Sequence, residues 1–236
     1  MVAVSTGLAI QNRILATLPH EEFSRLQPHL KTVALAKGEI VYLTGDDIRY
    51  VYFPNSGLLS LLSTTETGAT CEVAMVGREG VVGLPVVLRN NMIPYEVTVQ
   101  FATEAFKISA EALQAEFDKG QTLYELVLRY LNVLLVQMSQ SSICHRFHTF
   151  DKMFCEWLLL VKDRVDSDYL NLTQETISSR LGVPRTAVTA AAGALQKAGI
   201  IRYSRGKIFI LDRARLEANS CECYRINRDE LDQFLK

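Results

Sequence analysis

The clearest pattern of hydrophobic and polar positions lies within residues 172–212, where its period changes. Apolar residues recur at helical spacing over two short segments and then alternate with polar residues over two shorter ones. Thr173 is placed to cap the first helix, and Gly182 supplies the positive φ of the turn that follows. Pro184 fits the first turn of the second helix, which should end at Gly199. The pattern predicts a helix-turn-helix.

A β-hairpin should follow these two helices. Residues 200–203 and 207–210 alternate around the turn at 204–206, which is the signal of a hairpin. Together the elements form a winged helix-turn-helix, whose second helix enters the major groove of DNA. We expect double-stranded DNA to be contacted by Thr173, Gln174, Thr176, Arg185, Thr186, Thr189, Arg202, Ser204, Arg205 and Lys207.

Charge supports contact with DNA. Residues 171–215 carry eight basic residues against only Glu175 and Asp212, a net charge of +6. Because the whole chain has a net charge of −1, the remainder carries −7. A basic module on an acidic body suits phosphate contact, which releases counterions from the nucleic acid.

The first half of the chain has a different pattern. Short apolar runs are separated by recurring glycines, and no long helical pattern interrupts residues 33–108. In residues 95–101 the odd positions are apolar and the even positions are polar, the period of a strand with one buried face. After a short amphipathic opening, we therefore expect an antiparallel roll or barrel.

The period becomes helical again after residue 109. A short helix over residues 110–117 should lead into a long one over residues 121–144. The long helix carries two apolar stripes, Tyr124, Leu128, Leu131, Leu135 and Met138 in one, and Leu123, Val127, Tyr130 and Leu134 in the other. Such a helix can pack on its own β domain and also on a second copy of the chain. We expect the first stripe to form a dimer interface, although the pattern alone does not decide between the stripes.

The predicted fold class is α+β. One more amphipathic helix is expected over residues 150–164, and a final short helix over residues 228–234. The domains expected are a β-roll sensor with flanking helices at residues 1–120, a dimerisation helix at 121–147 and a winged helix-turn-helix at 148–236.

Composition is that of an ordinary soluble protein, with 48% hydrophobic and 22% charged residues. The N-terminus lacks the basic segment and apolar run of a secretory signal. The most apolar stretch, residues 123–138, is interrupted by charged and amide side chains, so we expect no contact with a membrane. Five cysteines, an odd number without framework spacing, fit a reducing cytoplasm.

The order of these elements resembles the Crp/Fnr regulators. Gly38-Glu39, Gly45-Asp46, Val51-Tyr52-Phe53 and Ser56-Gly57 are similar to the opening of that family's cyclic-nucleotide-binding-type β-roll, and residues 172–188 to its helix-turn-helix. The resemblance covers about residues 12–215. It implies a homodimeric bacterial transcription regulator whose partners are an operator, a second copy, RNA polymerase and a small-molecule effector that the sequence does not identify.

The phosphate-binding segment departs from that family pattern. Cyclic-nucleotide-binding members place a Gly-Glu pair there and, further along, an Arg-Ser or Arg-Thr pair, which hold the ribose and the cyclic phosphate. Here the matching segments read Gly83-Leu84-Pro85 and Ile93-Pro94. We therefore expect an effector other than cyclic AMP and name no cofactor. The expected effector pocket comprises Val82, Gly83, Leu84, Arg89, Val97 and Val99.

The recognition helix departs as well. Members that read TGTGA-type half-sites commonly begin this helix with Arg-Glu and carry a further Arg one turn later. Here the matching residues are Arg185, Thr186 and Ala190. Arg185 retains the ability to grip guanine O6 and N7, whereas the other two offer neither carboxylate nor guanidinium. The half-site should therefore differ from that consensus, with Thr189 as an additional base reader.

Cysteines and histidines offer a different chemistry. No cysteine precedes Cys71, which excludes the N-terminal cysteine cluster of the family's iron–sulfur branch. Cys221-x-Cys223 supplies two thiolates, but a tetrahedral site needs two more ligands. Candidates for these lie at Cys144, His145, His148 and Cys155. Burial of these side chains is the simpler interpretation, so we predict no metal site.

Two alternatives to an effector-controlled DNA-binding regulator stay open. One is a regulator of the same architecture that senses redox state or metal through its cysteines. The other is a small-molecule signalling module whose winged domain contacts proteins rather than DNA. The chain contains no Gly-rich phosphate loop, nucleophile–base pair or paired carboxylates, so we do not expect an enzyme. The operator, the regulated genes and the sign of regulation are not encoded in these patterns.

Overall fold

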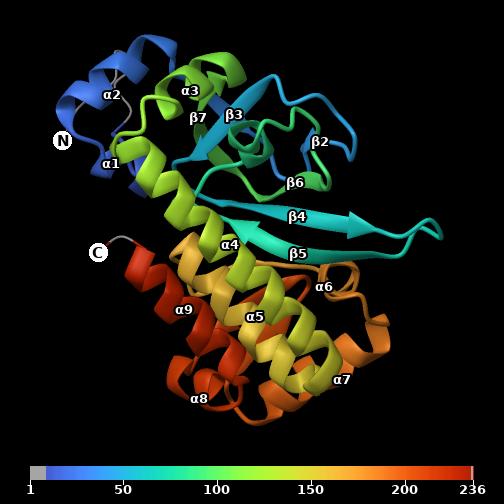
Figure 1. Ribbon diagram of the computed structural model, residues 1–236. Helices are drawn as coiled ribbons and strands as arrows, with labels where there is room; N and C mark the ends of the chain where they lie inside the picture. Colours follow the sequence, from blue (N-terminus) through green and yellow to red (C-terminus); the bar gives the residue numbers. More distant parts are fainter. Residues whose placement is uncertain (1–8, 235) are drawn as a thin grey trace. The chain divides into compact units, whose positions relative to one another are not determined.

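The computed structural model describes residues 9–234 and 236. The chain divides into two compact units. The first contains the described residues up to Leu61, Met75–Leu134 and the end of the chain from Gln233; the second contains Leu62–Ala74 and Leu135–Asp232 (Figure 1).

The first unit is an antiparallel β-roll with short flanking helices, as the sequence predicts. Its strands are β1 (Lys31–Leu35), β2 (Ile40–Tyr42), β3 (Tyr50–Pro54), the start of β4 (Leu58–Thr64), the end of β5 (Thr70–Val76), β6 (Glu96–Phe101) and β7 (Thr103–Ser109). Its helices are α1 (Arg13–Thr17), α2 (His20–Leu26), the 3-10 helices η1 (Gln27–His29) and η2 (Leu84–Leu88), α3 (Ala110–Phe117) and the start of α4 (Thr122–Phe147).

Two sheets make up the roll, with strand orders β1-β7-β3 and β2-β6-β4-β5. In the first sheet β7 is central and pairs antiparallel with both neighbours, so that Phe106 lies opposite Thr32 on one side and Phe53 on the other. Phe53 and Phe106 are completely buried. Aromatic and aliphatic side chains therefore fill the interior of the roll.

Strand β6 corrects one expectation about burial. The alternation in this segment predicts a buried apolar face and an exposed polar face, but the polar residues Thr98 and Gln100 are also buried. Within its sheet, β6 lies between β2 and β4. The side chain of Gln100 accepts a hydrogen bond from Ser60 on β4, which satisfies the buried carbonyl.

Helix α4 is fixed to the roll at two places in its first half. Both carboxylate oxygens of Glu22 on α2 accept hydrogen bonds from backbone N–H groups at its N-terminus, Thr122 at 3.1 Å and Leu123 at 2.9 Å. Further along, the buried ring of Tyr130 lies against Gly80. A Cβ atom at Gly80 would come within 1.9 Å of the Tyr130 hydroxyl, so only glycine fits there.

The second unit is mostly helical. It contains the tip of the β4–β5 hairpin, the end of α4, and then α5 (Phe150–Val165), β8 (Tyr169–Asn171), α6 (Gln174–Leu181), α7 (Arg185–Lys197), β9 (Ile201–Ser204), β10 (Lys207–Ile210), α8 (Arg213–Ala218) and α9 (Glu222–Phe234). The amphipathic helix predicted over residues 150–164 is confirmed as α5, and Phe154, Trp157, Leu158 and Val161 on it are all buried.

Three elements of the second unit correct the sequence prediction. Strand β8 pairs with β10, so the sheet has three strands in the order β8-β10-β9 rather than two. Helix α8 lies in a segment for which the sequence analysis predicted no element; the side chain of Asp212 caps it by accepting from the Arg215 N–H. Helix α9 begins at Glu222, six residues before the predicted start at Arg228.

None of the helices in the described part of the chain combines the length and apolar character needed to cross a bilayer.

Candidate nucleic-acid interface, sensor cavity and cysteine cluster

The two helices of the predicted helix-turn-helix are present, with the expected cap. The hydroxyl of Thr173 accepts a hydrogen bond from the Thr176 N–H at 3.1 Å at the start of α6. Gly182 ends α6 with a φ of +62°. Pro184 stands one position earlier than predicted, as the N-cap of α7 rather than in its first turn. On the inward face of α7, Val188, Ala191, Ala192 and Leu195 are all buried.

The opposite face of α7 carries the predicted base readers. Arg185, Thr186 and Thr189 are all exposed. One guanidinium nitrogen of Arg185 lies 2.5 Å from a carboxylate oxygen of Glu175 on α6. Both side chains of this ion pair are largely exposed, and such pairs contribute only about 0–1 kcal/mol, so Arg185 is available to exchange Glu175 for another partner. The Thr189 hydroxyl donates to the Arg185 carbonyl oxygen at 2.9 Å.

The hairpin β9–β10, called the wing from here on, has a tight turn. Arg205 and Gly206 both have positive φ, at 50° and 75°, as a two-residue turn of type I′ requires. Gln196 on α7 accepts a hydrogen bond from the Tyr203 N–H at 2.7 Å, which connects the wing to the recognition helix.

Two basic side chains of the wing, Arg202 and Lys207, lie over aromatic rings and are exposed to solvent. The guanidinium of Arg202 lies 4.7 Å from the centre of the Phe209 ring, and the ammonium of Lys207 lies 5.9 Å from that of Tyr169. Ser204 and Arg205 are exposed at the turn, Thr173 is exposed beside it, and Gln174 and Thr176 are half-buried. All ten predicted DNA-contacting residues thus belong to one helix-turn-helix and its wing.

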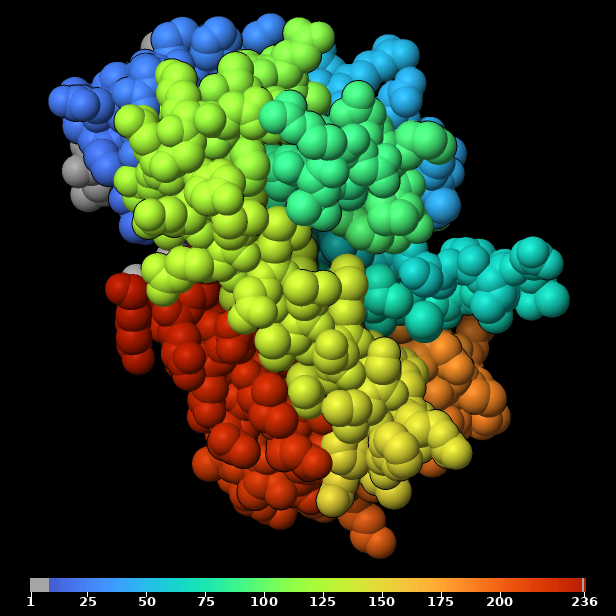
Figure 2. All heavy atoms as spheres, in the orientation of Figure 1, coloured from blue at the N-terminus to red at the C-terminus, as the bar shows by residue number. Residues whose placement is uncertain are grey.

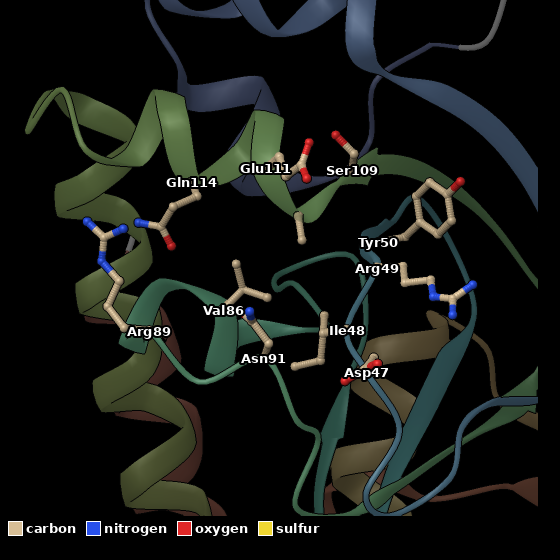
Figure 3. Close-up of a pocket in the computed structure, with 11 residues that line it drawn as sticks. Asp47, Ile48, Arg49, Tyr50, Val86, Arg89, Asn91, Ser109, Glu111 and Gln114 are labelled. Atoms are coloured by element: carbon tan, nitrogen blue, oxygen red, sulfur yellow. The ribbon is translucent and has the colours of Figure 1, made fainter.

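A cavity of about 670 Å³ opens within the first unit (Figure 3). Three segments supply its walls: the end of the β2–β3 connection with the start of β3, η2 with the loop after it, and the junction of β7 with α3. The lining residues are Asp47, Ile48, Arg49, Tyr50, Val86, Arg89, Asn91, Ser109, Ala110, Glu111 and Gln114. The cavity is therefore largely polar, with both cations and carboxylates.

The predicted effector residues divide into two groups. Arg89 lines the cavity, but both oxygens of Asp118 accept from one of its guanidinium nitrogens, at 3.0 and 2.9 Å. The apolar members are instead packed in the core of the roll: Val82, Leu84, Val97 and Val99 are each at most 2% exposed. Gly83 precedes η2 with a φ of 100°. The polar lining residues at positions 47, 49, 91, 109, 111 and 114 were not anticipated from the sequence.

The two stripes of α4 differ in exposure. Leu123, Val127, Tyr130 and Leu134 are buried within the chain. In the other stripe, Tyr124, Leu128 and Leu135 are 38%, 39% and 63% exposed, and Leu131 and Met138 are partly exposed. Helix α4 is visible on the near face in Figure 2, in green to yellow. The Tyr124 ring packs on Phe117, whereas Leu128 and Leu135 of this stripe are exposed among the described residues.

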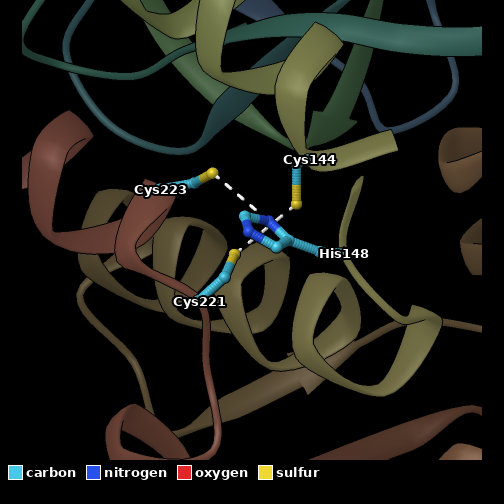
Figure 4. Close-up of side chains that lie close together, drawn as sticks. All are labelled: Cys144, His148, Cys221 and Cys223. Carbon is cyan, nitrogen blue, oxygen red and sulfur yellow. Dashed lines mark hydrogen bonds between the residues drawn. The ribbon is translucent and has the colours of Figure 1, made fainter. Parts of the chain in front are cut away.

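Four metal-ligating side chains meet in the second unit. Cys144 near the end of α4, His148 just after it, and Cys221 and Cys223 at the start of α9 place their ligand atoms within 4.8 Å of one another (Figure 4). The three cysteines are buried. Of the other sequence candidates, His145 is exposed and Cys155 lies outside this group.

The thiols of the cluster perturb each other's acidity. The hydrogen bond that Cys144 and Cys221 share, together with the nearby N–H of Cys223, lowers the pKa of Cys221 to about 5. The same pairing raises the pKa of Cys144, and burial raises that of Cys223 to about 12.

Two domain families match the chain. The cyclic nucleotide-binding domain matches residues 32–120, and the Crp-like helix-turn-helix domain matches residues 154–219. The first match covers the strands of the roll with the cavity, and the second covers α5–α8 with the wing. No curated relative matches the chain.

Solved structures of similar fold cover almost the whole chain. One is a transcriptional regulator of the Crp/Fnr family from Eubacterium rectale, 21% identical, with a TM-score of 0.69 over 87% of this chain and 96% of that one. Another is FixK2 from Bradyrhizobium japonicum, 16% identical, with a TM-score of 0.71 over 81% and 98%. A third is the c-di-GMP-responsive regulator CLP of Xanthomonas campestris, 16% identical, with a TM-score of 0.64 over 81% and 99%.

Proposed function

The chain belongs to the Crp/Fnr family of DNA-binding transcription regulators, and we propose that it acts as a homodimer that reads a two-fold-related operator. Members of this family regulate transcription and are not enzymes. The expected site of action is the cytoplasm, and RNA polymerase is the further partner that family membership suggests.

The observation that carries this proposal is the exposed face of α7. Arg185, Thr186 and Thr189 lie on it, and the basic wing follows directly in the chain. A recognition helix of this kind reads base edges from its N-terminal residues, while basic side chains beside it contact phosphates. Arginine at the first position of the helix favours a guanine in each half-site.

The exposed stripe of α4 supports the homodimer. Each chain leaves Tyr124, Leu128 and Leu135 exposed on a helix of 26 residues, and the apolar positions recur at the spacing of a coiled-coil seam. A second copy offers the same stripe, so a two-fold axis would bury both. Paired recognition helices would then read half-sites about 34 Å apart, one turn of DNA.

The sensor domain supports an effector other than cyclic AMP. Leu84 and Ile93, which stand where the family resemblance places the ribose and phosphate ligands, are buried in the roll and offer no polar side-chain atom. Arg89, the nearby cation, is paired with Asp118. The polar cavity beside η2 is the site that we propose for a small molecule.

The experiment that tests DNA recognition is selection from a random duplex library with the purified full-length chain. We expect enrichment of an inverted repeat and an affinity that falls steeply with salt, because each phosphate contact releases counterions. Failure to enrich any sequence, together with binding that does not respond to salt, would favour the alternative in which the winged domain contacts protein.

A further inference from the structure

The cysteine cluster has the dimensions of a single-ion site. The Cys144 and Cys221 Sγ atoms are 3.5 Å apart, and Cys223 Sγ is 3.6 Å from His148 Nδ1. Around a tetrahedral zinc ion with bonds of about 2.3 Å to sulfur and 2.0–2.1 Å to nitrogen, neighbouring ligand atoms stand roughly 3.6–3.8 Å apart. The four side chains are therefore close to the spacing that one such ion imposes (Figure 4).

Local structure explains how the four ligands come together. The His148 N–H donates to the Cys144 carbonyl oxygen at 3.1 Å, so the helical turn continues and stacks these two side chains on one face. Cys221 and Cys223 flank the first residue of α9, where exposed backbone N–H groups and the helix dipole favour thiolates. Each pair comes from one rigid turn, and both turns belong to the second unit.

His148 has the second contact that metal-ligating histidines usually make. Its Nδ1 atom points to Cys223, while Nε2 lies 3.3 Å from a carboxylate oxygen of Glu222. A carboxylate that accepts from the free ring N–H fixes the tautomer and the orientation of a ligating imidazole. Glu222 sits between the two cysteines in sequence, so one short segment supplies two ligands and the group that orients a third.

We propose that Cys144, His148, Cys221 and Cys223 bind one zinc ion in a closed tetrahedral site that fastens the start of α9 to the end of α4. Three thiolates and an imidazole are the donor set of structural zinc sites. Four protein ligands leave no open position, which makes the ion structural rather than catalytic. An iron–sulfur cluster is bound through several irons, and its ligands stand further apart than ligands that share one ion.

A metal site was not expected from the sequence, in which only the two thiols of Cys221-x-Cys223 lie close together. It does not depend on the operator or on the effector. It adds a point of attachment between the helix with the dimer stripe and the segment that follows the DNA-reading elements.

The test begins with elemental analysis of the full-length chain purified under reducing conditions. We expect about one zinc ion per chain and release of the zinc when the thiols are blocked by a mercurial reagent. After exchange with Co²⁺, the protein should show the visible d–d bands of a tetrahedral cobalt site and ultraviolet thiolate-to-cobalt charge transfer.

Matched variants separate ligand loss from loss of fold. Cys221→Ser and Cys223→Ser should remove the zinc, whereas Cys71→Ser, at a cysteine outside the cluster, should keep it. His148→Ala should weaken zinc binding and His148→Cys should restore it, because a fourth thiolate also completes a tetrahedral site. Glu222→Gln should lower zinc affinity about tenfold without removing a ligand.

Three results would overturn the proposal. One is reduced, folded chain that holds no zinc and develops no cobalt spectrum. Another is iron with inorganic sulfide in place of zinc. The last is full zinc content in folded Cys221→Ser and Cys223→Ser chains, which would place the ion elsewhere.

Discussion

Substitution of Arg185 tests whether α7 reads DNA bases. In the free chain Arg185 forms an ion pair with Glu175, and a contact with a base would have to replace this pair. Arg185→Ala should weaken binding to the selected operator by about 1–3 kcal/mol and relax the preference at one base pair of each half-site. Fluorescence anisotropy with the operator and its single-pair variants measures both effects. Unchanged affinity and unchanged preference would show that α7 is not the recognition helix.

A substitution in the wing, Lys207→Ala, provides the comparison with Arg185→Ala in the recognition helix. Lys207→Ala should weaken binding to all duplexes alike and reduce the slope of log affinity against log salt by about one unit, because a phosphate contact carries no sequence information. The same anisotropy titrations, repeated at several salt concentrations, check it. A loss confined to one base pair would instead make Lys207 a base reader.

Candidate site residues could be predicted from the sequence where they lie close together along the chain. Thr173, Arg185 and Lys207 could be assigned to the helix-turn-helix and its wing because capping, turn and charge signals lie within one short segment. Asp47, Asn91 and Gln114 share a cavity but come from three distant segments, and no local period records which loops a roll brings together. The cysteine cluster lies between these cases: Cys221-x-Cys223 was visible, but its meeting with Cys144 and His148 was not.

At the scale of elements, the cap that Glu22 supplies to α4 should make stability depend on pH. Burial acts to raise the pKa of Glu22, but hydrogen bonds from Thr122 and Leu123 outweigh it and lower the pKa below its ordinary value of 4.5. The ionised cap therefore stabilises the fold at neutral pH, and this contribution is lost as the pH falls through the lowered pKa.

Glu22→Gln should accordingly reduce the free energy of unfolding by about 1 kcal/mol at pH 7, with the difference from the natural chain shrinking below pH 4.5. Urea titrations across this range measure it. Glu21→Gln, at the exposed neighbouring carboxylate, is the control and should leave stability nearly unchanged. A Glu22→Gln deficit that persists undiminished in acid would contradict the capping role.

The exposed stripe of α4 predicts the assembly. Light scattering should give twice the chain mass of 26.5 kDa for the natural protein. Leu135→Glu should yield folded monomers, because a two-fold seam would bury two carboxylates against apolar side chains. Leu135→Met preserves an apolar surface and should remain dimeric. A natural chain that is monomeric at micromolar concentration rules out this interface.

The element boundaries that sequence reasoning missed have a common cause. Helix α9 was expected to begin at Arg228, yet it starts at Glu222, and Cys221, Cys223 and Tyr224 before Arg228 are buried. In strand β6, Thr98 and Gln100 are polar and yet buried, and Gln100 accepts a hydrogen bond from Ser60. Period-based reasoning assigns burial from side-chain polarity, and it fails where polar groups find partners inside.

At the scale of the whole molecule, the sensor should not respond to cyclic AMP. Calorimetric titration with cyclic AMP and cyclic GMP should detect no micromolar binding, and neither nucleotide should change operator affinity. A ligand shifts a conformational equilibrium only by its differential affinity for the two states, so weak binding cannot act as a switch. Micromolar affinity joined to a tenfold gain in DNA binding would overturn this prediction.

The contact between Gly80 and Tyr130 bears on how a conformational change in the β-roll could reach the dimer helix α4. With no room for even a methyl group at Gly80, the loop that carries it and the first half of α4 cannot slide past one another. We therefore expect a displacement of the loop to shift the first half of α4 as well, and with it the apolar stripe that this part of the helix carries.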